Sequence, residues 1–112
     1  MPLLGDNGHK EMVDNLKMIA ATISKPSAIL LISAHWEEAM PTITRAANPP
    51  LIYDYYGFPE QAYEVQYPAP GQPDLAQTVF STLRSKGIKS ALDEKRGFDH
   101  GLFVPLKIMY PE

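Results

Sequence analysis

Apolar residues recur in two different patterns along the first part of the chain. Residues 8–24 repeat them at helical spacing with charged and polar residues between, and this pattern predicts an amphipathic helix. Residues 27–36, SAILLISAHW, are a nearly continuous apolar run, which is typical of a strand covered on both faces of a parallel sheet. Residues 41–46, PTITRA, predict a second short strand. The helical stripe consists of Met12, Leu16, Ile19, Ala20 and Ile23.

The C-terminal part predicts a further helix, strand and helix. Residues 73–87 have a proline in the first turn and end on Gly87, which is a usual C-terminal cap. Residues 88–92 predict a strand, 95–101 a loop, and 102–110 a short helix with Pro105 in its first turn. Together these elements predict an α/β fold, with a partial parallel or mixed sheet flanked by helices.

Residues 47–73 are rich in proline and tyrosine and interrupt this order. Prolines oppose regular helices and strand pairing, so one interpretation is a disordered, low-complexity segment. Disordered segments are poor in aromatic residues, however, and we therefore expect an ordered insertion packed on the domain, with 63–67 as a short strand. Its tyrosines either line a pocket for an aromatic ligand or cover the loop itself. They are Tyr53, Tyr55, Tyr56, Tyr63 and Tyr67.

Length and composition narrow the function. The chain has 112 residues and a net charge of −3, with no basic tract, so we expect neither a second domain nor a nucleic-acid partner. There is no cysteine, so a metal site would use His, Asp or Glu ligands. The N-terminus carries no long apolar run, and we expect a cytoplasmic protein without a membrane partner. Since no strand precedes the first helix or follows the last, we treat residues 1–112 as a single partial domain of a larger unit.

His35 is placed where ligands bind in α/β proteins. It ends the predicted strand at 27–36, and the carboxyl edge of a parallel sheet is the usual binding edge. A neutral imidazole there suits a metal ligand, which Glu37 or Glu38 would orient or supplement. The alternative is a structural histidine packed beside Trp36.

The two other histidines have different surroundings. His100 lies in GFDHG between Gly97 and Gly101, a setting that suits general acid–base chemistry or an exposed residue after an ordinary Asp99 turn. His9 begins a helix and reads as a surface residue. A metal site made from His9, His35 and His100 is a further alternative, because non-haem iron and zinc accept three histidines.

Four segments in order resemble one family, and they cover most of the chain. They are PLLGDNGHKEMV (2–13), ISAHWEE (32–38), PPLIYDYYGFPEQAYEVQYPAPG (49–71) and RGFDHGLFVPLKIMYPE (96–112). They resemble the class III extradiol ring-cleaving dioxygenases, in the branch similar to DOPA dioxygenase and related to the catalytic subunit of protocatechuate 4,5-dioxygenase. The resemblance covers the family's N-terminal half.

The resemblance implies a metal-dependent oxidoreductase of aromatic compound metabolism, which opens a small catechol with O2 using non-haem Fe(II) or, in some members, zinc. By resemblance His35 matches a metal ligand and His100 a catalytic acid–base or substrate-binding histidine. We assign their neighbours Trp36 and Asp99 to substrate binding.

The chain departs from the family pattern at its start, where Met1 and Pro2 stand in place of a glycine-rich stretch with another ligand histidine. The resemblance places the remaining ligand beyond residue 112. We therefore expect a truncated or split dioxygenase-like chain that binds a metal incompletely or not at all. The alternative is a non-catalytic interaction protein, and both interpretations predict a homo-oligomer or a complementing chain.

Overall fold

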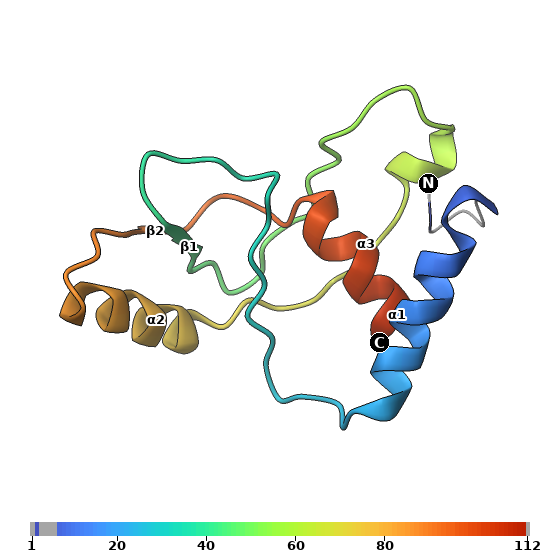
Figure 1. Cartoon of the computed structure of the whole chain (residues 1–112). Helices are drawn as coiled ribbons and strands as arrows, with labels where there is room; N and C mark the ends of the chain where they lie inside the picture. The colour runs from blue at the N-terminus through green and yellow to red at the C-terminus, as the bar shows by residue number, and fades with distance from the viewer. Residues whose placement is uncertain (1, 3–6, 112) are drawn as a thin grey trace.

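The computed structural model describes residue 2 and residues 7–111, and it has an α/β fold with three α-helices and one small parallel sheet. Figure 1 shows the elements in chain order. None of the described helices is long and apolar enough to span a membrane. The elements are η2 (Asn7–His9), α1 (Lys10–Thr22), β1 (Thr42–Thr44), η3 (Glu60–Tyr63), α2 (Pro73–Ser85), β2 (Ala91–Asp93) and α3 (His100–Met109).

The sheet consists of β1 and β2, which run parallel with Ile43 opposite Leu92. Backbone hydrogen bonds continue the pairing on both sides, from Ala91 to the carbonyl of Pro41 and from Arg45 to that of Asp93. α2 connects the strands and packs against both. The strand predicted at 41–46 is therefore confirmed as a three-residue core, and the strand predicted at 88–92 is confirmed with a shift, because β2 covers Ala91–Asp93.

The ends of α2 follow from its sequence, as predicted. Pro73 stands at the first turn, and the side chain of Gln72 accepts a hydrogen bond from the backbone N–H of Asp74. At the other end Gly87 has a φ of 76°, which glycine adopts without strain. The N–H groups of Gly87 and Ile88 bond back to the carbonyls of Arg84 and Leu83, which is the Schellman arrangement.

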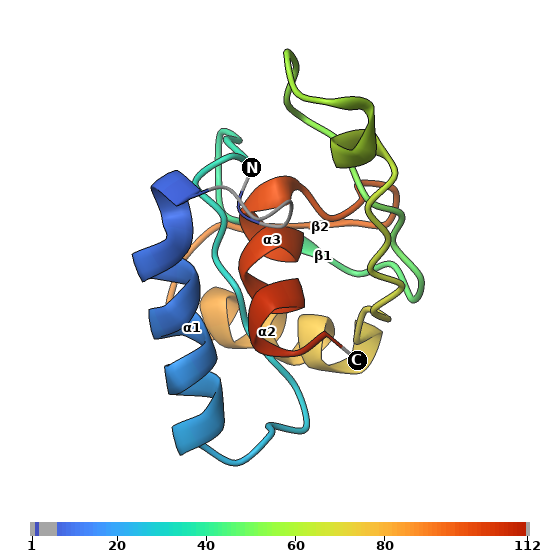
Figure 2. The ribbon, with the colours of Figure 1, turned by 90° about the vertical axis from the view of Figure 1, so that its right-hand side faces the viewer.

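The buried core lies on the other side of the molecule, around α3. Phe103 is fully buried, and Val104 and Tyr67 complete the cluster. Figure 2 shows α1 beside α3. The predicted stripe of α1 is only partly covered: Leu16 and Ala20 are half-buried, and the remainder is exposed.

The proline-rich segment packs on this core, as expected for an ordered insertion. Ala62 and Tyr67 are buried, and the hydroxyl of Tyr67 donates a hydrogen bond to the carbonyl of Tyr110 at 2.9 Å. The strand predicted at 63–67 is wrong. The Tyr53 hydroxyl donates to the carbonyl of Val65, so a side chain satisfies backbone that a strand partner would otherwise pair.

The buried strand predicted at 27–36 is also wrong. The segment is extended as far as Ser33 and turns at 34–35, and no described residue pairs with it in a ladder. Leu30 is 67% exposed and Ile32 is 91% exposed. A continuous apolar run becomes a central strand only where neighbouring strands pair with its backbone and other layers cover its faces.

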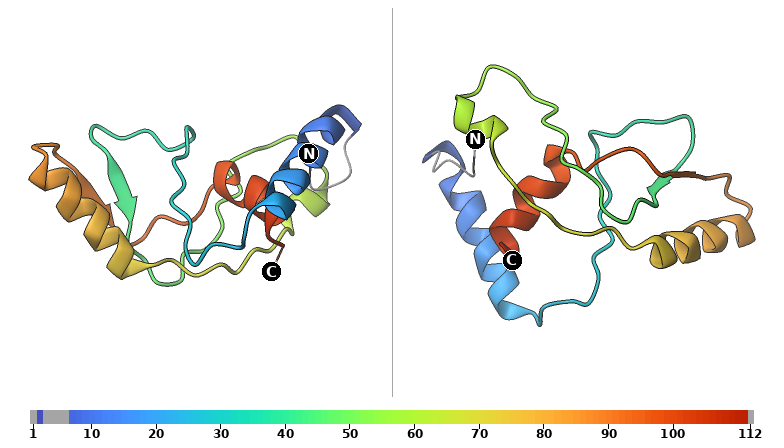
Figure 3. Two further views of the ribbon diagram at one scale, coloured as in Figure 1. Left: turned by 60° about the horizontal axis from the view of Figure 1, so that its bottom comes forward. Right: turned by 180° about the vertical axis from the view of Figure 1, so that it is seen from behind.

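The molecule is correspondingly extended. Figure 3 shows α2 and the sheet at one end and α1 with α3 at the other, joined by irregular segments. Its radius of gyration is 15.3 Å, against about 13 Å for a compact domain of this length. The irregular segments that cross between the two ends carry Ser33, His35 and Asp54.

Candidate functional site

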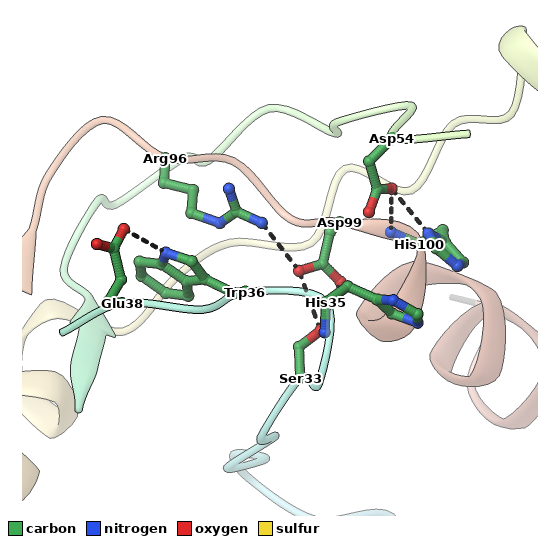
Figure 4. Close-up of polar contacts among 8 residues, drawn as sticks. All are labelled: Ser33, His35, Trp36, Glu38, Asp54, Arg96, Asp99 and His100. Atoms are coloured by element: carbon green, nitrogen blue, oxygen red, sulfur yellow. Dashed lines mark hydrogen bonds and ion pairs between the residues drawn. The ribbon is translucent and has the colours of Figure 1, made fainter. Parts of the chain in front are cut away.

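The structure brings His35 and His100 together, although 27–36 is not a strand. Their ring centroids lie 4.1 Å apart at an interplanar angle of 33°. Figure 4 shows the two rings where the turn after Ser33 meets the start of α3. His35 is exposed, and the His100 side chain is 31% exposed, so both rings are accessible to a small molecule.

Backbone pairing brings the insertion to the start of α3. Leu51 and Phe98 form a parallel bridge, with hydrogen bonds from Phe98 to Pro50 and from Ile52 to Phe98, each 2.7 Å. Gly97 permits this approach, because a Cβ there would lie 2.1 Å from the carbonyl oxygen of Pro50. The two paired segments continue in the same direction, so Asp54 lies beside the first turn of α3.

Asp54 contacts His100 twice. Its Oδ1 accepts the backbone N–H of His100 at 3.0 Å and lies 2.8 Å from ring Nδ1. Burial acts to raise the pKa of Asp54, but hydrogen bonds from the His100 backbone and ring outweigh it, so its net pKa is lowered. This carboxylate also caps the helix, and α3 therefore begins at His100. The prediction that His100 lies in a loop before a helix at 102–110 is corrected accordingly.

A buried carboxylate holds the segment that carries His35. Asp99 is 4% exposed, and both its oxygens accept the hydroxyl of Ser33, at 2.9 and 3.0 Å. The same hydroxyl accepts the backbone N–H of His35 at 3.2 Å. Asp99 also pairs with the guanidinium of Arg96 at 3.2 Å. Ser33 and Arg96 thus bind both oxygens of the carboxylate that the sequence assigns to substrate binding.

The indole of Trp36 lies against the same guanidinium. The Arg96 carbon Cζ is 4.8 Å from the Trp36 ring centroid, which is a cation–π distance. The indole N–H donates to Glu38 at 3.0 Å, so Glu38 interacts with Trp36 and not with His35. Glu37 is exposed.

Gly101 provides the space for the histidine contact. A Cβ at this position would lie 2.6 Å from Cδ2 of His35 and 2.8 Å from the hydroxyl of Ser33. Any side chain would therefore displace the segment that carries His35.

Aromatic side chains from the insertion form a wall beside the two histidines. Tyr55 meets the ring of His100 edge to face at 5.6 Å, and it packs against Phe103, Phe58 and Tyr63. Its hydroxyl donates to the carbonyl of Ala62. Burial raises the pKa of Tyr55, so this hydroxyl stays protonated at neutral pH. Tyr55, with Phe58 and Tyr63 packed against it, forms an apolar surface beside His100 that suits an aromatic ligand.

The described residues do not form a complete metal site. Among residue 2 and 7–111, no three His, Asp or Glu side chains are grouped closely enough to hold an ion. His9, His35 and His100 are therefore not assembled as one site. His35 alone offers one imidazole, and zinc sites in proteins take at least three protein ligands.

Three contributors to the site were missed from the sequence: Asp54, Ser33 and Arg96. Asp54 meets His100 from 46 positions away, and Ser33 meets Asp99 from 66. Such contacts have no local spacing to reveal them. Part of the first matched segment, residues 3–6, lies outside the described residues.

Comparisons with known proteins find one matching family and several similar proteins. The chain matches the family described as "Catalytic LigB subunit of aromatic ring-opening dioxygenase" over residues 6–112. It is 48% identical to dioxygenase tasH of Hapsidospora irregularis over 120 residues, covering 100% of this chain and 37% of that protein. It is 49% identical to the 4,5-DOPA dioxygenase extradiol of Beta vulgaris over 89 residues, covering 79% and 33%. The Escherichia coli (strain K12) protein of that name is 40% identical over 113 residues, covering 100% and 40%.

These relatives confirm the resemblance found in the sequence. The chain spans about a third to two fifths of their length. The family match covers nearly the whole chain and includes both histidines. The chain therefore belongs to the family of the catalytic LigB subunit of aromatic ring-opening dioxygenases.

Proposed function

We propose that this chain contributes His35 and His100 to the site of an extradiol-type dioxygenase that opens a small catechol with O2. The observation that carries the proposal is the contact between these rings, 4.1 Å between centroids, beside an aromatic wall. Family membership supports the reaction class, and relatives are named as dioxygenases. The whole activity is a proposal for this chain, because it spans at most 40% of the relatives cited.

We assign different roles to the two histidines. His35 is the more exposed of the two, and its ring has no carboxylate partner among the described residues. We propose it as a metal ligand. His100 has a carboxylate at Nδ1, the arrangement of an oriented general acid or base, and is proposed to exchange a proton with the substrate hydroxyl. The Tyr55 ring would pack against the substrate.

The family implies a metal cofactor, and we propose Fe(II) or Zn(II) for it. The described residues do not fit a complete site, so the remaining ligands must come from elsewhere. A longer polypeptide, a complementing chain or a second copy are the candidate sources. Asp99 and Trp36 are proposed to act at the substrate side by shaping the turn that carries His35, since Asp99 already binds Ser33 and Arg96.

The metal content of histidine variants distinguishes the proposed role of His35 from that of His100. The protein is loaded anaerobically with Fe(II) or Zn(II), desalted and measured for metal per chain across a range of protein concentrations. We expect His35→Ala to lose bound metal and His100→Ala to keep it, with His9→Ala as the matched control that also keeps it. Metal retention that depends on His9 and not on His35 would refute the assignment and favour a different histidine site.

A second candidate function, association without catalysis, is favoured by one specific observation. Leu30 and Ile32 are 67% and 91% exposed on an extended segment whose backbone lacks a ladder partner among the described residues. Such surfaces promote pairing with another chain, and a symmetric dimer is the simplest closure. Sedimentation equilibrium tests this: self-association that is lost in Ile32→Glu supports it, and a monomer at all concentrations opposes it.

A further inference from the structure

Asp54 is the one charged group among the described residues that touches the ring of His100, and it belongs to neither histidine motif. It reaches the site from the proline- and tyrosine-rich insertion, far from both histidine motifs (Figure 4). Its side chain is 22% exposed, so water competes with it only in part. These observations call for an account of what this carboxylate does.

We propose that Asp54 is a positioning residue that fixes the tautomer of His100, holding the proton of the neutral ring on Nδ1 and leaving Nε2 as the acceptor that faces the substrate. The use made of Nε2 rests on the proposed function. The tautomer itself does not, because it follows from contacts within the chain.

The hydrogen-bonding pattern decides which atom donates. Oδ1 of Asp54 accepts the backbone N–H of His100 at 3.0 Å, and a backbone N–H is only ever a donor. The same oxygen lies 2.8 Å from Nδ1 of the ring. An ionised carboxylate has no proton to give, so Nδ1 must be the donor of the second bond. The lowered pKa of Asp54 supports the ionised form at neutral pH.

Two further contacts fix the plane of the ring. His35 lies against it with centroids 4.1 Å apart, and Tyr55 meets it nearly perpendicularly, at 87° and 5.6 Å. With Asp54 bound to Nδ1, these contacts leave little freedom for the ring to rotate. Among the described residues Nε2 of His100 has no hydrogen-bond partner, so its lone pair is available to a ligand.

The two nitrogens of the His100 ring therefore have different roles. Nδ1 is committed to the protein, and Nε2 is the only nitrogen that can accept a proton from a substrate hydroxyl. Without Asp54 the neutral ring would exchange between two tautomers, and in one of them Nε2 would carry a proton and could not accept another.

The experiment measures directly which ring nitrogen of His100 carries the proton. Long-range proton–nitrogen correlation spectra of the 15N-labelled full chain, without metal or catechol, distinguish protonated from unprotonated ring nitrogens. They are recorded at increasing pH until the His100 ring shows one protonated and one unprotonated nitrogen, which identifies its neutral form. His100→Gln assigns the signals. In the wild-type protein we expect His100 to carry its proton on Nδ1.

Three variants complete the experiment. Asp54→Ala should shift His100 toward the Nε2-protonated form, whereas Asp54→Asn should keep the Nδ1 proton because its amide oxygen still accepts both hydrogen bonds. Asp14→Ala, a carboxylate paired only with Lys10 on the surface of α1, should change nothing. A wild-type His100 protonated on Nε2, or an Asp54→Ala spectrum identical to wild type, would overturn the proposal. If Asp54→Ala fails to fold, the wild-type and Asp54→Asn spectra still decide it, and a lack of ring-opening activity leaves the result unaffected.

Discussion

The carboxylate of Asp99 accepts a hydrogen bond from the hydroxyl of Ser33 at 2.9 Å, across 66 positions of sequence. This bond connects the turn that carries His35 to the residue before α3. It thereby holds the ring of His35 close to that of His100. Asp99 is buried, and its other partner is the guanidinium of Arg96. The contact between the histidines therefore depends on a structural polar cluster behind them.

Removing the charge of Asp99 should destabilise the protein. Asp99→Asn leaves the guanidinium of Arg96, whose side chain is only 25% exposed, without its carboxylate. We expect the free energy of unfolding to fall by about 2–3 kcal/mol, the cost of an unpaired buried charge-assisted hydrogen bond. Urea denaturation measures this. Asp14→Asn, at an exposed ion pair, is the control that should leave stability unchanged. An Asp99→Asn protein as stable as wild type would mean that Asp99 serves the ligand alone.

A methyl group at position 101 should separate the two histidine rings. The added Cβ of Gly101→Ala would meet Cδ2 of His35 at 2.6 Å, so we expect the ring–ring nuclear Overhauser effects to disappear. Gly87→Ala is the matched control: its positive φ costs about 1–2 kcal/mol of stability, but it has open space around it and should preserve the ring contact. Persistent ring contacts in Gly101→Ala would show that the turn at 34–35 adapts freely.

Stability should fall in acid because of two aspartates. Hydrogen bonds from the backbone N–H groups of Arg96 and Lys95 lower the pKa of Asp93, and those from His100 lower the pKa of Asp54 despite its burial. A carboxyl with a lowered folded-state pKa contributes stability above its unfolded pKa, about 3.9, and this is lost as pH falls through the folded value. The free energy of unfolding should therefore decrease from about pH 5 downward. Asp93→Asn should flatten this decrease, and curves of equal slope would contradict the assignment.

Truncating the centre of the core should cost far more than truncating a neighbouring aromatic. Phe103 is fully buried between Tyr53 and Tyr55, so Phe103→Ala should lower the free energy of unfolding by about 3–5 kcal/mol. Tyr56, in the same insertion, is 92% exposed, and Tyr56→Ala should have little effect. Thermal or urea unfolding compares the two. Similar losses in both variants would mean that α3 and the insertion do not share a core.

The sequence predicted best where short-range rules decide the structure. Pro73 and Gly87 delimit α2 because ring geometry and a left-handed backbone each specify a helix end locally. The strand at 27–36 failed because an apolar run fixes only a preference for burial. Pairing and covering layers decide whether it becomes a strand, and here Ile32 remains exposed.

In the candidate site, too, the sequence identified the residues that lie in local motifs and missed those that depend on distant contacts. The sequence singled out His35 and His100 by their motifs, and the structure brings them together, while their roles stay predictions. Asp54 has no such motif, because its contact arises from the bridge between Leu51 and Phe98. The start of α3 at His100 was missed for the same reason, since the carboxylate that accepts the N–H of its first residue comes from a distant segment.

Catechol-dependent oxygen uptake tests the central claim most directly. The Fe(II)-loaded protein is compared with His100→Ala at equal metal content, with the ring-opened product followed by its absorbance. With a second copy of the chain as the source of the missing ligands, we predict metal- and catechol-dependent uptake that rises with protein concentration and falls by about 10²- to 10⁴-fold in His100→Ala, the usual contribution of a general acid or base. Equal rates in the two proteins would contradict the proposal that His100 acts in a ring-opening site, and no uptake by the wild-type protein at any concentration tested would contradict a site completed by a second copy.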